Sequence, residues 1–227
     1  MLLLDIFLDP GKVFIALKER PTFLVPLLVF VAVLVASTLA YFLRVDPVWY
    51  ADHVLAMAGT EMTTAEIAQA KQFMPSAPVQ GYIGTAVAAI ATPLLFALFA
   101  VYYLLAGKVA GAAVTFKHAM ALSTWASMPT VLGIAVMLVG ALLMAPQTAQ
   151  NTLMLTNVDP LLVQLPYDSA FSGLAKGFSL ITFWVIGLTA LGWKTFTGSG
   201  WKSALLVAVL PTLVFYGGWL AFALLRA

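Results

Sequence analysis

The chain has 227 residues, of which 63% are hydrophobic and only 9% carry a formal charge, against about 25% in ordinary soluble domains. So few charged side chains cannot cover a globule in water, which excludes a soluble domain and makes lipid the expected surroundings of most of the surface. The net charge of +2 gives no sign of nucleic-acid binding, and the absence of cysteine excludes disulfides, thiolate metal sites and cysteine nucleophiles.

The first predicted element is a short amphipathic helix over residues 9–20. Asp9 is a typical N-cap and Pro10 suits the first helical position, while a second proline at position 21 ends the helix. One face of this segment carries Val13, Phe14 and Leu17. We expect the helix to lie on the cytoplasmic membrane surface with that face toward lipid.

Four uncharged stretches, and a fifth whose only charge is Lys176, are long enough to be membrane spans. An ionised side chain costs roughly 2.5 to 3.5 kcal/mol at the centre of a spanning helix, so long gaps between charges mark the spans. About 20 helical residues, rising about 1.5 Å each, cross a hydrocarbon core of about 30 Å. The expected spans are residues 22–43, 82–106, 120–144, 170–193 and 203–225.

Two longer loops on the outer side separate these spans. The first, residues 44–81, contains Thr63-Thr64-Ala65-Glu66, a capping box in which Thr63 and Glu66 satisfy backbone donors of the first helical turn. This box predicts a helix to about Phe73, which forms a small hairpin with a helix over residues 47–58. The second loop, residues 145–169, is polar and rich in amides, and is expected to form a smaller outer cover.

The distribution of Lys and Arg predicts the orientation, because basic residues gather on the cytoplasmic side. With a cytoplasmic N-terminus, seven basic residues are inside: Lys12, Lys18, Arg20, Lys108, Lys117, Lys194 and Lys202. Four remain outside: Arg44, Lys71, Lys176 and Arg226. The expected fold class is therefore all-α, a polytopic membrane protein with five transmembrane helices, the N-terminus cytoplasmic and the C-terminus outside.

The sequence lacks the patterns that carry catalysis or cofactor binding. It has no H-E-x-x-H, no G-x-S-x-G, no P-loop and no glycine fingerprint. His53 and His118 are expected on opposite sides of the membrane, so they cannot share a metal ion. A hydrolase that pairs His118 with Ser123 or Ser127 is a distant alternative, because a histidine beside Lys117 at a membrane boundary is more typical of a headgroup contact. We expect no catalytic residue, no cofactor and no metal.

Five positions are the candidates for helix packing or for contact with a partner: Pro93, Lys117, Trp125, Pro129 and Lys176. The two prolines each free a backbone carbonyl that a neighbour must satisfy. Lys176, the one charge inside an expected span, is expected to reach back toward the headgroups. Membrane-interface anchors are expected at Trp49, Trp125, Trp193 and Trp201. A substrate cavity at the proline-broken helices is the alternative to tight packing.

Four stretches of the chain resemble bacterial Yip-domain proteins. IFLDPGKVFIALKERPTFLVPLL is similar to their opening, with a short Asx-Pro helix, a basic patch and a proline-containing first span. EMTTAEIAQAKQFMP resembles their first loop, and LLAGKVAGAAVTFKHAMALSTWASMP resembles their Gly/Lys hinge before a proline-containing span. NVDPLLVQLPYDSAFSGLAKGFSLITFWVIGLTALGWKTFTGSGWKSALLV resembles their last helix pair.

This resemblance implies five spans with a cytoplasmic N-terminus, in a bacterial inner (cytoplasmic) membrane. Eukaryotic relatives bind Rab-type GTPases and vesicle-coat factors through a cytosolic N-terminal domain and act in membrane trafficking. The present sequence shows neither that domain nor its Asp-Leu-Tyr-Gly-Pro motif, and Thr124-Trp125 replaces the Gly-Tyr before the third-span proline. The resemblance therefore implies the membrane scaffold without GTPase binding.

The expected function is that of a non-enzymatic membrane scaffold or adaptor, which organises the membrane or holds a protein or lipid partner. The expected partners are the bilayer, with anionic lipid at the cytoplasmic face, and an unidentified membrane or cytosolic protein, while a homo-oligomer is left open. The alternative is a transporter of small solutes or lipids that uses the proline-broken helices.

Overall fold

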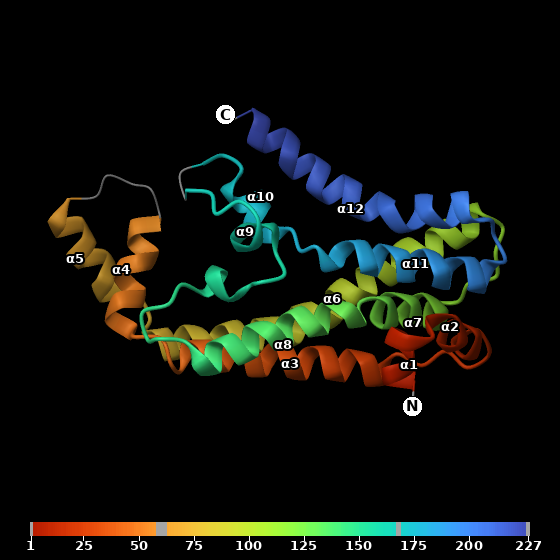
Figure 1. The fold of residues 1–227 in the computed structure, drawn as a ribbon, viewed down its shortest axis with the longest axis horizontal. Coiled ribbons are helices and arrows are strands. Elements are labelled where there is room, and N and C mark those ends of the chain that lie inside the picture. The colour runs from red at the N-terminus through yellow and green to blue at the C-terminus, as the bar shows by residue number, and fades with distance from the viewer. Residues whose placement is uncertain (1, 58–62, 167–168, 226–227) are drawn as a thin grey trace.

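The structure is a computed structural model that describes residues 2–57, 63–166 and 169–225, and in these ranges every regular element is a helix (Figure 1). The elements are α1 (Leu2–Leu8), α2 (Pro10–Glu19), α3 (Leu24–Phe42), α4 (Pro47–Met57), α5 (Thr64–Phe73), α6 (Ala77–Val109), α7 (Phe116–Ala126), α8 (Met128–Leu143), the 3-10 helix η1 (Gln150–Leu153), α9 (Val158–Leu161), α10 (Ser172–Gly177), α11 (Ile181–Thr197) and α12 (Trp201–Leu224).

The helices form an elongated bundle with two distinct ends (Figure 1). α3 packs against α6 and α8, and α11 packs against α12, α2 and α7. We call the end that holds α1, α2 and the α6–α7 and α11–α12 loops the α2 end. The opposite end, which holds α4, α5 and the turn after α8, is the α4 end. Both the N-terminal hairpin of α1 and α2 and the start of α12 therefore lie at the same end.

Four helical segments are long and apolar enough to cross a membrane: Leu24–Phe42, Ala77–Val109, Phe116–Leu143 and Trp201–Leu224. The third is α7 and α8 together, with Ser127 between them. Each overlaps one of the expected spans, which confirms an all-helical fold with apolar helices of membrane-spanning length. α11 has 17 residues and is about 26 Å long, so it falls short of the other four.

The single helix expected over residues 170–193 is instead two helices joined by extended backbone. α10 ends at Gly177 and α11 begins at Ile181, and Phe178 between them has φ −94° and ψ 114°. This extended segment pairs with the preceding loop, because Val158 N donates to Phe178 O at 2.9 Å and Leu180 N donates to Thr156 O at 2.9 Å. The helix is therefore interrupted where a neighbouring strand-like segment supplies the backbone hydrogen bonds.

The α2 helix also differs from its expected surroundings. Its N-cap is as predicted, since Asp9 Oδ1 accepts a hydrogen bond from Lys12 N. Its apolar face, however, is buried in the protein, with Val13, Phe14 and Leu17 at most 1% exposed. The helix packs against α7 and α11 rather than laying this face on lipid. α1, which the sequence analysis did not predict, adds Ile6 to the same core.

The main hydrophobic core draws on α1, α2, α3, α6, α7, α8, α11 and α12, and much of it lies toward the α2 end. Gly192 of α11 is needed for its close packing. A Cβ at this position would lie 2.5 Å from Leu122 Cδ1 and 2.7 Å from Phe14 Cε1. A second, much smaller cluster at the α4 end consists of Tyr41, Val45, Ala77 and Ala141.

Candidate functional site

The five candidate positions are distributed over four helices. Pro93 is inside α6, Lys117 and Trp125 are on α7, Pro129 is in the first turn of α8, and Lys176 is on α10. Trp125 and Pro129 lie on either side of the α7–α8 break, whereas the others belong to separate parts of the fold. The structure therefore offers three separate regions to consider, namely the α2 end, the α7–α8 break and the α4 end.

At the α2 end, Trp125 is part of the core. It is 1% exposed, and its Nε1 donates a 2.7 Å hydrogen bond to the carbonyl oxygen of Thr22 in the α2–α3 link. Trp193 is also fully buried, so the interface-anchor interpretation is wrong for both residues. The reason is that the α1–α2 hairpin folds back over α7 and α11. Trp201, by contrast, is 51% exposed with Lys194 Nζ 5.1 Å from its ring centroid.

His118 joins three helices at the same end. Its Nδ1 is 2.7 Å from Thr115 Oγ1, and its Nε2 is 3.0 Å from the carbonyl oxygen of Lys18. Lys18 Nζ in turn donates to the Thr195 carbonyl oxygen at 2.8 Å, so the ends of α2, α7 and α11 are tied together. Both ring nitrogens have protein partners, which contradicts the expected headgroup contact. A cavity of about 230 Å³ lies beside His118 and Thr197.

Basic side chains surround this end of the bundle. The exposed ones form what we call the basic rim: Lys12, Lys18, Arg20, Lys108, Lys117 and Lys202. Among the acidic residues of this end, Asp9 and Glu19 are exposed as well. Lys117, a candidate partner position, lies in the first turn of α7 next to His118. The rim can therefore bind anionic groups while the core beneath it holds the helix ends in place.

The α7–α8 break contains Pro129, which is fully buried. Proline cannot donate to the carbonyl of Trp125 four residues earlier, and the N–H of Ser127 contacts that carbonyl instead. Ser127 Oγ also donates to the Ser123 carbonyl oxygen at 2.8 Å. A small cavity of about 90 Å³ lies here, and Ser123, Ser127, Thr189 and Thr212 are among the residues that line it.

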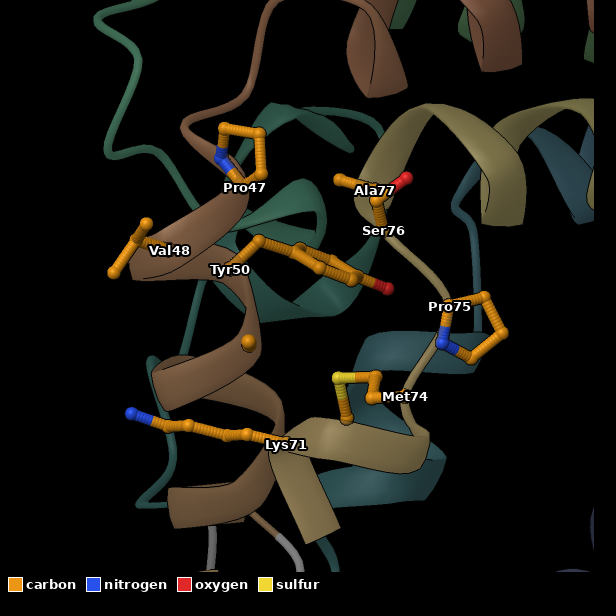
Figure 2. Close-up of a pocket in the computed structure, with 9 residues that line it drawn as sticks. Pro47, Val48, Tyr50, Lys71, Met74, Pro75, Ser76 and Ala77 are labelled. Carbon is orange, nitrogen blue, oxygen red and sulfur yellow. The ribbon is translucent and has the colours of Figure 1, made fainter. Parts of the chain in front are cut away.

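At the α4 end, the predicted hairpin is present and encloses a cavity. Thr63 Oγ1 accepts a hydrogen bond from Glu66 N while Glu66 accepts one from Thr63 N, which confirms the capping box. The cavity, of about 270 Å³, lies between α4 and the α5–α6 corner (Figure 2). Tyr50 and Met74 point toward it in Figure 2, and Tyr50 OH donates to Gln80 Oε1 at 3.3 Å.

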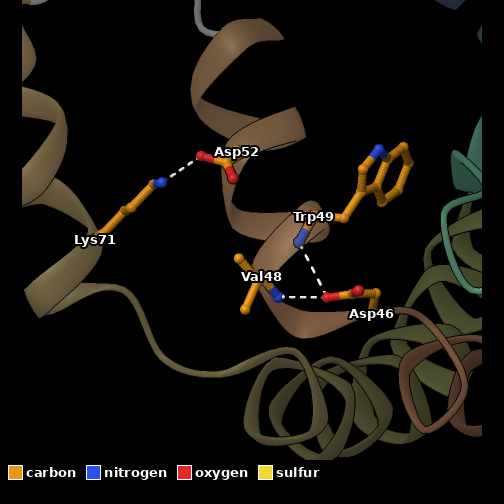
Figure 3. A network of polar contacts seen from close by, with 5 residues as sticks. All are labelled: Asp46, Val48, Trp49, Asp52 and Lys71. Carbon is orange, nitrogen blue, oxygen red and sulfur yellow. Dashed lines mark hydrogen bonds and ion pairs between the residues drawn. The ribbon is translucent and has the colours of Figure 1, made fainter.

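Polar contacts fix the two helices of this hairpin. Asp46 Oδ1 accepts hydrogen bonds from Val48 N at 2.8 Å and Trp49 N at 3.1 Å, and so caps α4 (Figure 3). Lys71 of α5 forms an ion pair with Asp52 of α4 (Figure 3). The charged side chains of Asp46, Asp52 and Lys71 therefore stabilise the hairpin itself.

Lys176 lies in α10, outside α11. Its carbonyl oxygen accepts a 2.6 Å hydrogen bond from Asn157 Nδ2. Burial lowers the pKa of Lys176, although the nearby Asp159 carboxylate opposes this shift. Burial and the positive charge of Lys176 together lower the pKa of His53, whose ring stacks on Trp49 at 4.7 Å. Lys176 thus belongs to the short helix α10 rather than to a spanning helix from which it would snorkel.

In the three described ranges, no group of three or more His, Asp or Glu side chains is arranged to hold a metal ion. The surface features that the described residues do show are a basic rim, small cavities and apolar helix faces. Sequence reasoning did not identify the His118 bridge or the burial of Trp125. The signal in the sequence was the apolar face of residues 13–17, because such a face can be covered by protein as well as by lipid.

Comparison with known proteins identifies one family. The model described as "Yip1 domain" matches residues 4–222 of the chain. The chain is also similar to the membrane protein YknW of Bacillus subtilis (strain 168), with 25% identity over 209 residues that cover 90% of this chain and 84% of the relative. No solved structure matches the chain.

Proposed function

Because the chain belongs to the Yip1 domain family, we propose that it is a non-enzymatic scaffold or adaptor of the bacterial inner membrane, which holds a partner at the α2 end. One observation carries this proposal: the basic rim lies on the best-packed part of the molecule. A rigid, positively charged platform suits the binding of anionic lipid or of an acidic protein surface. It also fits the concentration of buried side chains in α7, where residues 119–126 are all buried.

The proposed topology has five spans, with the α2 end in the cytoplasm and the C-terminus outside. α11 is the fourth of these spans in chain order, because it packs along α12 and shares the α2 end with it. Charges in the four longer candidate spans fall close to the α2 end, at Lys108, Lys117 and Lys202. The count of seven basic residues inside against four outside supports this orientation.

Single cysteines test the topology, since the native chain has none. A Gly198→Cys variant in the α11–α12 loop is expected to react with an impermeant maleimide only from the cytoplasmic side. A Gln69→Cys variant on α5 is expected to react only from outside. The reverse pattern contradicts the orientation, and reaction of both variants from one side contradicts the five-span arrangement.

The scaffold role is tested by photo-crosslinking in native membranes. A benzophenone amino acid replaces Lys117 on the rim, and the matched control replaces Leu94, which is 64% exposed on the apolar surface of α6. The rim probe is expected to give discrete protein or anionic-lipid adducts that are lost when Lys12 and Lys202 are changed to Glu. Identical adducts from both probes contradict a platform at the α2 end.

A transporter is the second candidate function, and the α7–α8 break is the observation that favours it. The cavity near this break has Ser123, Ser127, Thr189, Pro211 and Thr212 among its lining residues, and it offers a polar solute a place between the spans. Flux measurements in proteoliposomes distinguish the scaffold from the transporter. The vesicles contain radiolabelled sugars and amino acids, and their membrane contains fluorescent phospholipid. Flux of any of these that Pro129→Ala abolishes contradicts the scaffold, whereas crosslinked partners without flux support it.

A further inference from the structure

An apolar groove of about 450 Å³ lies along the outer half of α12. Its other wall is the cover segment, which we define as the described residues between 145 and 180. The lining residues are Val158, Val163, Leu165, Phe171, Leu174, Ala175, Phe178, Leu213, Tyr216, Gly217 and Leu220. In Figure 1 this region is where α12 diverges from α11 and the cover segment lies between α12 and the rest of the bundle.

The groove walls carry a single polar side-chain group. That group is the Tyr216 hydroxyl, and it already donates a 3.0 Å hydrogen bond to the carbonyl oxygen of Gly177. Bound water needs two to four polar partners, so a cavity with these walls does not hold ordered water. The chemistry of the lining selects a hydrocarbon ligand.

The position along α12 places the groove at the depth of the lipid chains. At about 1.5 Å per residue, Leu213 and Leu220 lie about 18 Å and about 28 Å along the helix from Trp201 at its start. A hydrocarbon core is about 30 Å thick, so both fall in the half of the bilayer nearest the α4 end. Only 6% of the most apolar stretch of α12 is buried in the protein, against 33% for the α7–α8 span. Lipid therefore has direct access to this helix.

The groove is held open by contacts between α10 and α12. The Trp219 ring lies against two glycines of α10, where a Cβ on Gly177 would come within 2.8 Å of Cζ3 and one on Gly173 within 3.0 Å of Cζ2. The Phe178 and Tyr216 rings meet edge to face at 4.8 Å. These contacts fix the spacing between the cover segment and α12, so the cavity is part of the folded structure.

We propose that this groove binds one acyl chain of a phospholipid from the leaflet nearest the α4 end. The bound chain fills the space between α12 and the cover segment and adds the packing contacts that protein side chains do not supply there. The proposal requires α12 to span the membrane but does not depend on the scaffold role. A failure of the rim crosslinking experiment therefore does not contradict acyl-chain binding in the groove. A groove that binds no lipid likewise does not contradict the scaffold role.

Two neighbouring glycines of α12 provide a matched test. A Cβ on either Gly217 or Gly218 meets no atom within 4 Å, so the space beside the backbone is open at both positions. Only Gly217 lines the groove. In native mass spectrometry after extensive detergent washing, wild type and Gly218→Leu are expected to retain one phospholipid. Gly217→Leu is expected to retain it at least tenfold less. Equal retention by the two variants overturns the proposal.

A second experiment identifies the contact and tests a different occupant. Phosphatidylcholine with a diazirine in its acyl chain is expected to label Leu174 or Ala175, of which Ala175 is only 9% exposed and lines the groove. Labelling confined to exposed residues of α12 overturns the site. If a second copy of the chain fills the groove, oxidation of a Gly217→Cys variant gives a disulfide-linked dimer, which also overturns it.

Discussion

Helix α7 near the α2 end and helix α12 beside the cover segment are packed in different ways. In α7, eight successive residues from Ala119 to Ala126 are buried, including the polar Ser123 and Thr124. In α12, the residues beyond Pro211 include one buried residue within the described range, Ala223. The first region resembles the interior of a soluble protein, and the second leaves its helix largely to lipid.

The difference shows how one chain divides its stabilising interactions between two environments. At the α2 end, apolar faces of α1 and α2 have protein on the other side, and Ser123 and Thr124 donate to the carbonyls of Phe96 and Met120. Around the cover segment, backbone hydrogen bonds and glycine contacts on Trp219 hold the elements. Because lipid tails are as apolar as these side chains, burial by itself gives little driving force there.

The largest expected effect comes from truncating the core at the α2 end. Trp125→Ala removes a fully buried indole and its hydrogen bond to Thr22, and is expected to lower the free energy of unfolding by about 3 kcal/mol or more. The control Trp201→Ala, at an exposed position, is expected to change it by about 0.5 kcal/mol or less. Denaturant unfolding in detergent measures both. If both variants lose the same free energy of unfolding, Trp125 is no more important for packing than the exposed Trp201.

A smaller effect is expected at the α10–α12 contact. Gly177→Leu places a side chain where the Trp219 ring lies 2.8 Å from the Cβ position, and overpacking of this kind costs about 1–3 kcal/mol. We expect faster amide hydrogen exchange over residues 172–180 and unchanged exchange in α7. In the control Gly187→Leu, the Cβ meets no atom within 4 Å, so exchange should stay as in wild type. Loss of protection in α7 would mean that the two regions do not behave separately.

Local patterns in the sequence predicted the hairpin at the α4 end well. The capping box at Thr63 and Glu66 involves atoms three residues apart, so its hydrogen bonds follow from the local sequence alone. The Asp9 cap of α2 followed for the same reason. The all-helical class followed from the uncharged stretches, which depend on composition rather than on tertiary contacts.

Features that depend on distant partners could not be predicted in this way. The break before α11 exists because Val158 and Thr156 form backbone hydrogen bonds with Phe178 and Leu180, which lie 20 and 24 residues further along the chain. The burial of Trp125 requires the α1–α2 hairpin to fold over α7. An amphipathic pattern shows that a face will be covered but does not show whether lipid or protein covers it.

A still smaller change is expected from the capping box of α5. Thr63→Ala removes the hydroxyl that accepts from Glu66 N, and the loss of an N-cap costs about 1 kcal/mol. Exchange of the amides in residues 64–73 should become roughly fivefold faster, while that of the α2 end stays the same. Thr63→Ser keeps the hydroxyl and should restore most of the protection. If the serine variant behaves like the alanine variant, the hydroxyl is not what holds the helix start.

The smallest expected effect is a pH dependence that distinguishes the hairpin from the α2 end. Burial and the charge of Lys176 lower the folded-state pKa of His53 below its ordinary value near 6.5, so the unfolded chain binds the proton more readily. The stabilising contribution is fully present above about pH 6.5 and is lost as the pH falls from there toward the lower folded-state pKa. Exchange over residues 47–57 should therefore quicken on acidification, and His53→Gln should abolish this response. A response in α4 that survives the His53 substitution would show that protonation acts through a different group.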